Sequence, residues 1–286
     1  MKLDGRREST QVDDRRGKKS GTALGCGGTI IVALIVWIMG GDPMSFLMDE
    51  AANSVAITTA EGDYVPNEKE EALAKFSKKI LAGTEDVWTE IFQQQGWGEY
   101  RKPRMVLFSR SVQSGCGSAT SATGPFYCSA DQTVYIDLSF FGEMETKLHA
   151  GGDFAYAYVI AHEVGHHVQY LLGTLQEVHR KQQNLSQKER NQLEVRLELQ
   201  ADFYAGIWAY HDNRIFNSIE SGDIEEGLNA ASQIGDDRLQ MKSQGYTVPD
   251  AFNHGTSQQR SSWLRKGLQT GDVRLGDTFS VPYTNL

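Results

Sequence analysis

The chain has 286 residues, of which 40% are hydrophobic and 23% are charged, and its formal net charge is −9. The apolar content is ordinary for a globular chain, and the length suits a single catalytic domain after an N-terminal region. Residues 1–20 carry a net charge of +3, which leaves −12 for the remainder. An acidic main body excludes nucleic acid as the expected partner, and the sequence has no Gly-rich phosphate loop.

The first predicted element is a transmembrane helix at residues 21–41. These 21 residues are uncharged, and a helix needs about 20 residues to span a bilayer. No small-x-small site follows the run, which disfavours a cleaved signal peptide. The apolar segment of the run comes after Cys26 rather than before it, which disfavours lipidation there. The basic tail, residues 1–20, is expected in the cytoplasm by the positive-inside rule. Residues beyond 41 are therefore predicted to be extracytoplasmic, and periplasmic if an outer membrane is present.

A linker at residues 42–66 is expected to lead into one domain at residues 67–286. Its first elements are predicted to be two helices, Asn67–Ile80 and Glu85–Gln95, separated at Gly83 with Thr84 as a cap. A strand is predicted at Arg104–Phe108. The expected fold class is α+β and mostly helical, with a small sheet.

Two cysteines of this domain, Cys116 and Cys128, flank a loop rich in Gly and Ser. The third cysteine, Cys26, lies in the predicted spanning segment, and a metal or redox role would need closer spacing or a second pair. In an oxidising compartment we expect a disulfide between Cys116 and Cys128.

Residues 133–138 form a run typical of a β-strand, just upstream of the helix that carries the main motif. We interpret it as an edge strand that holds an extended substrate by backbone hydrogen bonds. An ordinary sheet strand is the alternative.

The most informative pattern is the run His162-Glu163-Val164-Gly165-His166. It lies in a periodic apolar segment that is predicted to be a helix starting at Asp153 and ending near Gly173. Residues four apart share one helix face, so His162 and His166 can bind one zinc ion while Glu163 points toward a water molecule. His167 projects about 100° away from His166 and is predicted to be structural.

A zinc peptidase needs a third protein ligand. The metzincin pattern is excluded, because Gln169 and Leu172 stand where it requires Gly and His. The next predicted helix, which follows a capping box at residues 186–189, places Glu198 and Asp202 on one face. We predict that Glu198 is the third ligand and that Asp202 accepts a hydrogen bond from a ligand histidine, with Glu194 as the alternative ligand.

Two further helices are predicted, from Asp223 toward Gly235 and from Ser257 to Leu268. Between them, His254 precedes a glycine. It is expected either to reach the metal cleft and stabilise an oxyanion or to hold the C-terminal segment in place. The remaining histidines are expected at the surface: His149, His179 and His211.

The chain resembles a bacterial family of neutral zinc metallopeptidases (YpfJ-type). The resemblance is carried by residues 157–169 and 198–202, with further matches at 5–9, 124–128, 134–138 and 252–257. It implies a membrane-anchored zincin of the gluzincin kind. The chain departs from the family at Phe203 and Gly276, where cysteines are common, which suggests that a second disulfide was lost as a unit.

The predicted function is that of a membrane-anchored zinc peptidase. Zinc held by the two histidines and Glu198 would acidify a water molecule, and Glu163 would take its proton during attack on a peptide carbonyl. The expected partners are a peptide or protein substrate and the lipid bilayer. The alternative is a catalytically silent module of zincin fold that serves envelope assembly or acts like a chaperone. A module that keeps zinc only for structure would need a fourth protein ligand, normally Cys or His. This motif supplies Glu163 instead, which argues against the alternative.

Overall fold

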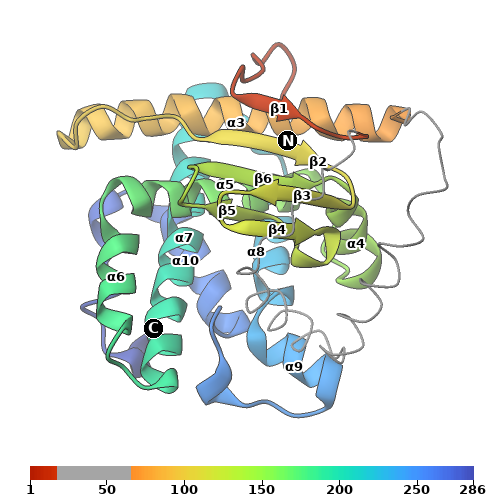
Figure 1. Ribbon diagram of the computed structural model, residues 1–286. Coiled ribbons are helices and arrows are strands. Elements are labelled where there is room, and N and C mark those ends of the chain that lie inside the picture. Colours follow the sequence, from red (N-terminus) through yellow and green to blue (C-terminus); the bar gives the residue numbers. More distant parts are fainter. Residues whose placement is uncertain (18–65) are drawn as a thin grey trace.

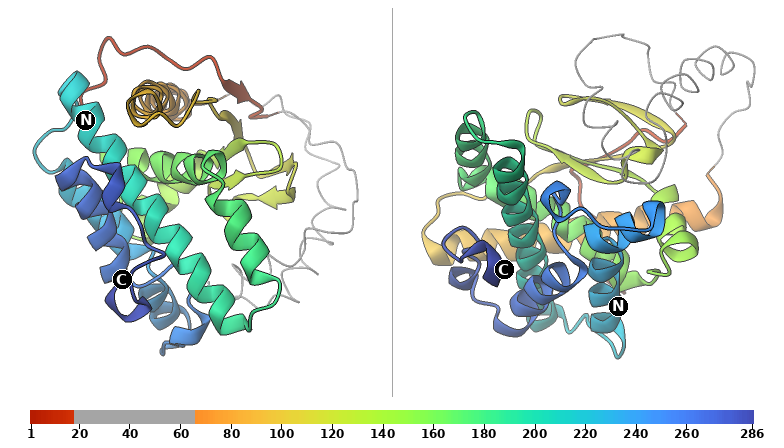
Figure 2. Two further views of the ribbon diagram at one scale, coloured as in Figure 1. Left: turned by 90° about the vertical axis from the view of Figure 1, so that its left-hand side faces the viewer. Right: turned by 90° about the horizontal axis from the view of Figure 1, so that it is seen from below.

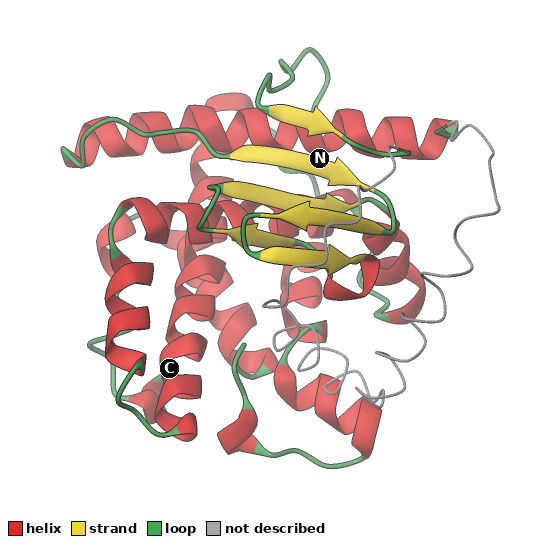
Figure 3. Ribbon diagram, in the orientation of Figure 1, coloured by secondary structure: helices red, strands yellow, loops and turns green. Residues whose placement is uncertain are grey.

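A computed structural model describes residues 1–17 and 66–286 (Figure 1). The fold is α+β and mostly helical, with a small sheet, as predicted (Figure 3). The expected spanning helix at 21–41 and nearly all of the expected linker lie outside the described residues. Within the two described ranges, no helix combines the length and the apolar character that a membrane crossing requires.

The main sheet has four strands in the order β1-β2-β6-β5. Strand β2 pairs in parallel with both β1 and β6, and β5 pairs antiparallel to β6. Their bounds are Val12–Asp14 for β1, Arg104–Phe108 for β2, Phe126–Cys128 for β5 and Thr133–Asp137 for β6. A separate hairpin, β3 (Ser111–Ser114) and β4 (Gly117–Thr120), lies between β2 and β5 in the chain.

The prediction that residues 133–138 form an exposed edge strand is wrong. Strand β6 lies between β2 and β5, and all five of its residues are buried. Val134 and Ile136 belong to the main helical core, whereas Tyr135 packs in a second cluster with the β3–β4 hairpin. Both faces of β6 are covered, as in an ordinary internal strand. Strand β5 occupies that edge of the sheet instead.

The two helices predicted between residues 67 and 95 are one helix, α3 (Glu68–Gln95), which begins at an Asn67 capping box. Gly83 does not break it. A Cβ atom at Gly83 would lie 2.6 Å from Arg6 Nη2 and 2.7 Å from Asp212 Oδ1. Glycine is therefore needed for the close approach of an ion pair, and Thr84 bonds back to the Leu81 carbonyl within the helix.

The helical part is built around α5 (Asp153–Leu171) and α7 (Gln187–Phe216), which pack against each other. A Cβ at Gly165 would lie 3.0 Å from the Ala201 carbonyl, so this glycine lets the two helices approach closely at the level of the main motif. The other helices are α4 (Ser139–Lys147), α6 (Thr174–Gln182), α8 (Asp223–Gln233), α9 (Asp236–Gln244) and α10 (Ser257–Thr270). The predicted helices from Asp223 and from Ser257 are confirmed.

Residues 1–17 were expected to form a tail separate from the domain, and the structure differs from this expectation. The segment runs from the end of α7 across α3 to the edge of the sheet, where it forms β1 (Figure 2). On the way Arg6 contacts Asp212 of α7 and Arg7 contacts Glu85 of α3.

Cys116 and Cys128 are joined in a disulfide, as predicted. It ties the turn between β3 and β4 to the end of β5. Phe203 and Gly276, the positions of the second disulfide that the resemblance implies was lost, are adjacent, because a Cβ at Gly276 would lie 2.5 Å from Phe203 Cε1. The phenylalanine ring therefore occupies the space beside Gly276.

Candidate active site

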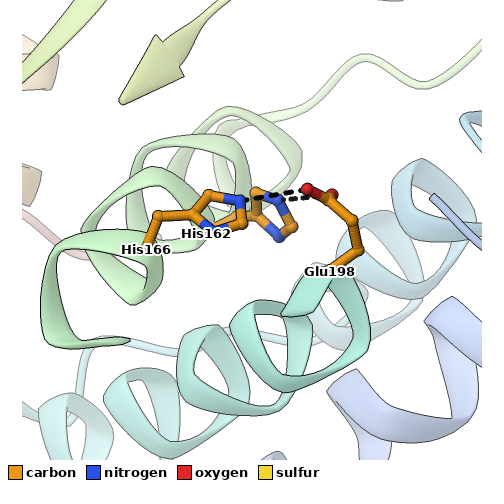
Figure 4. Close-up of side chains that lie close together, drawn as sticks. All are labelled: His162, His166 and Glu198. Atoms are coloured by element: carbon orange, nitrogen blue, oxygen red, sulfur yellow. Dashed lines mark ion pairs between the residues drawn. The ribbon is translucent and has the colours of Figure 1, made fainter. Parts of the chain in front are cut away.

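Three of the predicted side chains converge at the crossing of α5 and α7. His162 and His166 extend from α5 and Glu198 from α7 (Figure 4). His162 Nε2 lies 3.2 Å from Glu198 Oε2, and His166 Nε2 lies 3.3 Å from Glu198 Oε1. One donor atom from each residue lies within 4.8 Å of the others, so the three can surround one ion.

The inner nitrogens of both histidines are fixed by hydrogen bonds. His162 Nδ1 donates to Asp202 Oδ1 over 2.8 Å, and His166 Nδ1 donates to Gln169 Oε1 over 2.9 Å. In each ring the bond leaves Nε2 as the ligating atom and sets its direction. Two imidazole nitrogens and one carboxylate form a donor set that suits zinc and leaves its fourth position open. The residues present therefore fit a catalytic zinc ion.

Gln169 is a supporting residue that the sequence reasoning missed. It is fully buried, and its amide Nε2 donates to the Leu197 carbonyl over 2.7 Å. Its oxygen is thereby turned toward His166. The signal was present in the sequence, because Gln169 lies three residues after His166 on a buried helix.

Asp202 is held by a buried arginine that the sequence reasoning also missed. Arg260 of α10 donates from Nε to Asp202 Oδ2 over 2.9 Å and from Nη2 to Oδ1 over 3.0 Å. The Tyr158 hydroxyl donates to the same Oδ1 over 2.6 Å. Arg260 is 3% exposed and Asp202 is fully buried, so the pair neutralises its charges out of contact with water.

Opposite charges dominate the electrostatics of the site. Burial disfavours the charged form of His162, but the Asp202 and Glu198 carboxylates outweigh burial and raise the pKa of His162 to about 10. Burial also disfavours ionised Glu198, yet His166 and His162 hold the pKa of that carboxyl well below its usual range. The cluster therefore stabilises a cation beside an ionised Glu198.

Glu163 extends from the same helix as the two histidines and is 8% exposed. Burial raises the pKa of Glu163, while the neighbouring histidines oppose that shift. Its carboxylate makes no hydrogen bond to the residues that the structure describes. A buried carboxylate with a raised pKa beside the ligand set is suited to accept and return a proton.

His254 lies on the loop before α10, and Asp236 holds that loop. One oxygen of Asp236 accepts the backbone N–H groups of Asn253, His254 and Gly255, and the other lies 3.2 Å from His254 Nδ1. Burial lowers the pKa of His254, and its bond to Asp236 together with the charge of Glu198 raises that pKa overall. His254 Nε2 has no hydrogen-bond partner in the described part of the chain.

The other predicted residues lie outside this cluster. Glu194, the alternative ligand, accepts a hydrogen bond from Gln182 instead. His167 is fully buried and bonded to Tyr127 and to the Arg101 carbonyl, and burial lowers its pKa to about 4, as a structural role predicts. His149 and His179 are exposed as expected. His211 is partly exposed, and its Nε2 is hydrogen-bonded to the Gly271 carbonyl.

Comparison with known proteins shows which family the chain resembles. The model of the family described as "Putative neutral zinc metallopeptidase" matches residues 1–279. The chain is 47% identical to the protein YpfJ of Escherichia coli (strain K12) over 98% of this chain and 99% of that protein. It is 43% identical to Mb2605 of Mycobacterium bovis and to Rv2575 of Mycobacterium tuberculosis, over 64% of this chain and 64% of each relative. No solved structure matches it. The chain belongs to the neutral zinc metallopeptidase family.

Proposed function

We propose that the protein is a zinc-dependent peptidase that uses His162, His166 and Glu198 as metal ligands and Glu163 as the general base. The observation that carries this proposal is the meeting of the three donors with both inner histidine nitrogens anchored. Zinc, when bound there, supplies Lewis-acid chemistry that acidifies water and polarises a peptide carbonyl.

The residues around the proposed metal site transfer the proton, stabilise the developing charge and position the ligands. Glu163 takes a proton from the attacking water and gives it to the leaving amine, which its burial and raised pKa support. His254, in its protonated form, stabilises the negative charge that develops on the carbonyl oxygen: Nδ1 donates to Asp236 and Nε2 donates to that oxygen. Asp236 and the charge of Glu198 favour this form, because they raise the pKa of His254. Asp202, Arg260 and Gln169 position the two histidines.

The substrate and the location belong to the same proposal. The substrate class is a peptide or protein in the compartment that the domain faces. The Cys116–Cys128 disulfide supports an oxidising compartment outside the cytoplasm. Membrane association rests on the apolar residues 21–41 alone.

Metal content and hydrolysis of an unfolded protein substrate, measured together on the full chain, test this function. We expect Glu163→Gln to keep zinc and to lose hydrolysis by about 10²- to 10⁴-fold, because only proton transfer is removed. His162→Ala should lose both. Glu194→Gln is the matched control, since that carboxylate bonds to Gln182 outside the site, and it should keep both.

The outcomes separate the alternatives. Unchanged hydrolysis in Glu163→Gln would contradict the proposed base. A wild-type chain that holds zinc but cleaves no peptide in a broad library would instead support the catalytically silent module.

A further inference from the structure

The N-terminal segment, residues 1–17, completes the main sheet. Strand β1 pairs with β2 in the register Val12↔Met105 to Asp14↔Leu107. The Met105 N–H donates to the Gln11 carbonyl over 2.9 Å, and the Arg15 N–H donates to the Leu107 carbonyl over 2.8 Å. We call residues 1–17 the N-terminal strap. Backbone pairing of this kind requires the strap and β2 to be parts of one folded unit.

The strap also supplies the partner of a buried carboxylate on α7. Arg6 Nη1 and Nη2 donate to the two oxygens of Asp212 over 3.1 and 2.7 Å, and the guanidinium lies 3.7 Å from the centre of the Phe216 ring. The exposed fractions of the two side chains are 9% for Arg6 and 1% for Asp212. Gly83 of α3 leaves the room for this pair. Without Arg6, the Asp212 charge would lose its cation in a site with almost no water.

A second buried carboxylate, Glu85 of α3, also has its partners on the strap. Its side chain is 2% exposed, Arg7 Nη2 donates to it over 2.9 Å, and the buried hydroxyl of Ser9 donates to its other oxygen. Lys102 lies 3.6 Å away and is the remaining cation. Two acidic groups of the helical core are thus matched by side chains of the strap.

We infer that the strap is a structural part of the peptidase domain and lies in the same compartment as the active site. Strands β1 and β2 are hydrogen-bonded to each other, so the strap and the active site must lie on the same side of any membrane. In the folded chain the four arginines of the strap are paired with carboxylates. Arg16, for example, is 4% exposed in its side chain and paired with Asp14 and Glu71. The family match begins at residue 1 and includes the strap.

Cysteine labelling on cells tests the shared compartment. In full-length chains that carry Cys26→Ser, one variant has Glu8→Cys on the exposed outer side of the strap, and the matched variant has Gln93→Cys on exposed α3. A membrane-impermeant maleimide is added to spheroplasts, and each signal is divided by the signal after detergent lysis. Equal labelling of the two positions, whether high or low, is the expected result. Labelling of one position with protection of the other would overturn the inference.

Thermal unfolding of the full chain tests the docking itself. Arg6→Ala should lower the Tm by roughly 6–12 °C, because a buried charge loses its partner. Arg15→Ala is the control, since Arg15 pairs with Asp13 two residues away, and its Tm should change by less than about 2 °C. Arg6→Ala combined with Asp212→Ala should lose clearly less than the sum of the single changes. Equal Tm values for Arg6→Ala and Arg15→Ala, or strict additivity, would contradict docking of the strap.

Discussion

At the scale of single residues, the geometry of the site depends on the hydrogen-bond partners of His162 and His166. His162 is oriented by Asp202, and Asp202 is in turn held by Arg260 and Tyr158. His166 is oriented by Gln169. These contacts set where the two Nε2 atoms lie before any ion arrives, which reduces the conformational cost of binding the metal.

The first prediction concerns Asp202. Asp202→Asn removes the negative charge behind His162, so zinc affinity should fall by about 10- to 100-fold while the domain stays folded. Competition with a zinc-binding dye measures the affinity, and circular dichroism checks the fold. Asp250→Asn, an exposed carboxylate near the start of α7, should leave the affinity unchanged. Wild-type affinity in Asp202→Asn would show that the hydrogen bond does not matter.

The second prediction concerns Arg260. Arg260→Gln should weaken zinc binding by about tenfold, because Asp202 loses its two-pronged partner and becomes free to rotate. Arg260→Lys should recover part of that loss, since it keeps the charge but not the planar fork. Arg265→Gln, on the exposed face of the same helix, is the control. If Arg260→Gln and Arg265→Gln bind zinc equally well, Arg260 has no positioning role.

The meeting of His162, His166 and Glu198 was predictable because spacing in the sequence determines which face of a helix a side chain lies on. His162 and His166 are one turn apart on α5, as are Glu198 and Asp202 on α7, so each pair shares a face. Arg260 was not predictable by this route. Its partner lies 58 positions away in the sequence. Nothing in the pattern of its own helix distinguishes a buried arginine from a solvated one.

At the scale of elements, the periodicity of α5, α7 and α10 was easy to recognise in the sequence. The internal position of β6 and the continuity of α3 were not. A strand with both faces covered and an edge strand near a site can have the same residue types, so the sequence could not place β6 inside the sheet. Gly83 looked like a break because glycine weakens helices. Glycine is needed at position 83 because the Arg6–Asp212 ion pair lies against it, and a local sequence pattern cannot show a contact with residues so distant in the chain.

The third prediction concerns the disulfide between the β3–β4 turn and β5. Replacing Cys116 and Cys128 by serine should reduce the free energy of unfolding by about 3 kcal/mol, because the disulfide restricts the unfolded chain. Denaturant unfolding with and without reductant measures the loss, and Cys26→Ser is the control. Curves that coincide for the reduced and oxidised chains would mean that the disulfide does not constrain the unfolded state.

In the whole molecule, charged groups join distant parts of the chain at several places, among them the cluster of His162, His166 and Glu198 between α5 and α7 and the strap between α3 and α7. The fourth prediction follows from the first of these. The proposed zinc ion takes its ligands from both helices and needs them packed, so removing it with a chelator should lower the Tm. The shift should be roughly 5–15 °C for zinc present at 100–1000 times its Kd.

Differential scanning calorimetry of the full chain, before and after chelation, measures this shift. Readdition of zinc should restore the original Tm. The His162→Ala chain should melt at the same temperature under both conditions. If the chelator leaves the Tm of the wild-type chain unchanged, the two helices do not share an ion.

The pairing of Arg6 with Asp212 also has a consequence for the order in which the protein assembles. The two residues are 206 positions apart, so the strap leaves the ribosome long before its partner on α7 exists. Contacts between distant positions form slowly, because a long loop must close first. We therefore expect the helices to pack early and the strap to dock last. Until it docks, β2 presents an open edge that can pair with other chains, and newly made protein is most prone to aggregation during that interval.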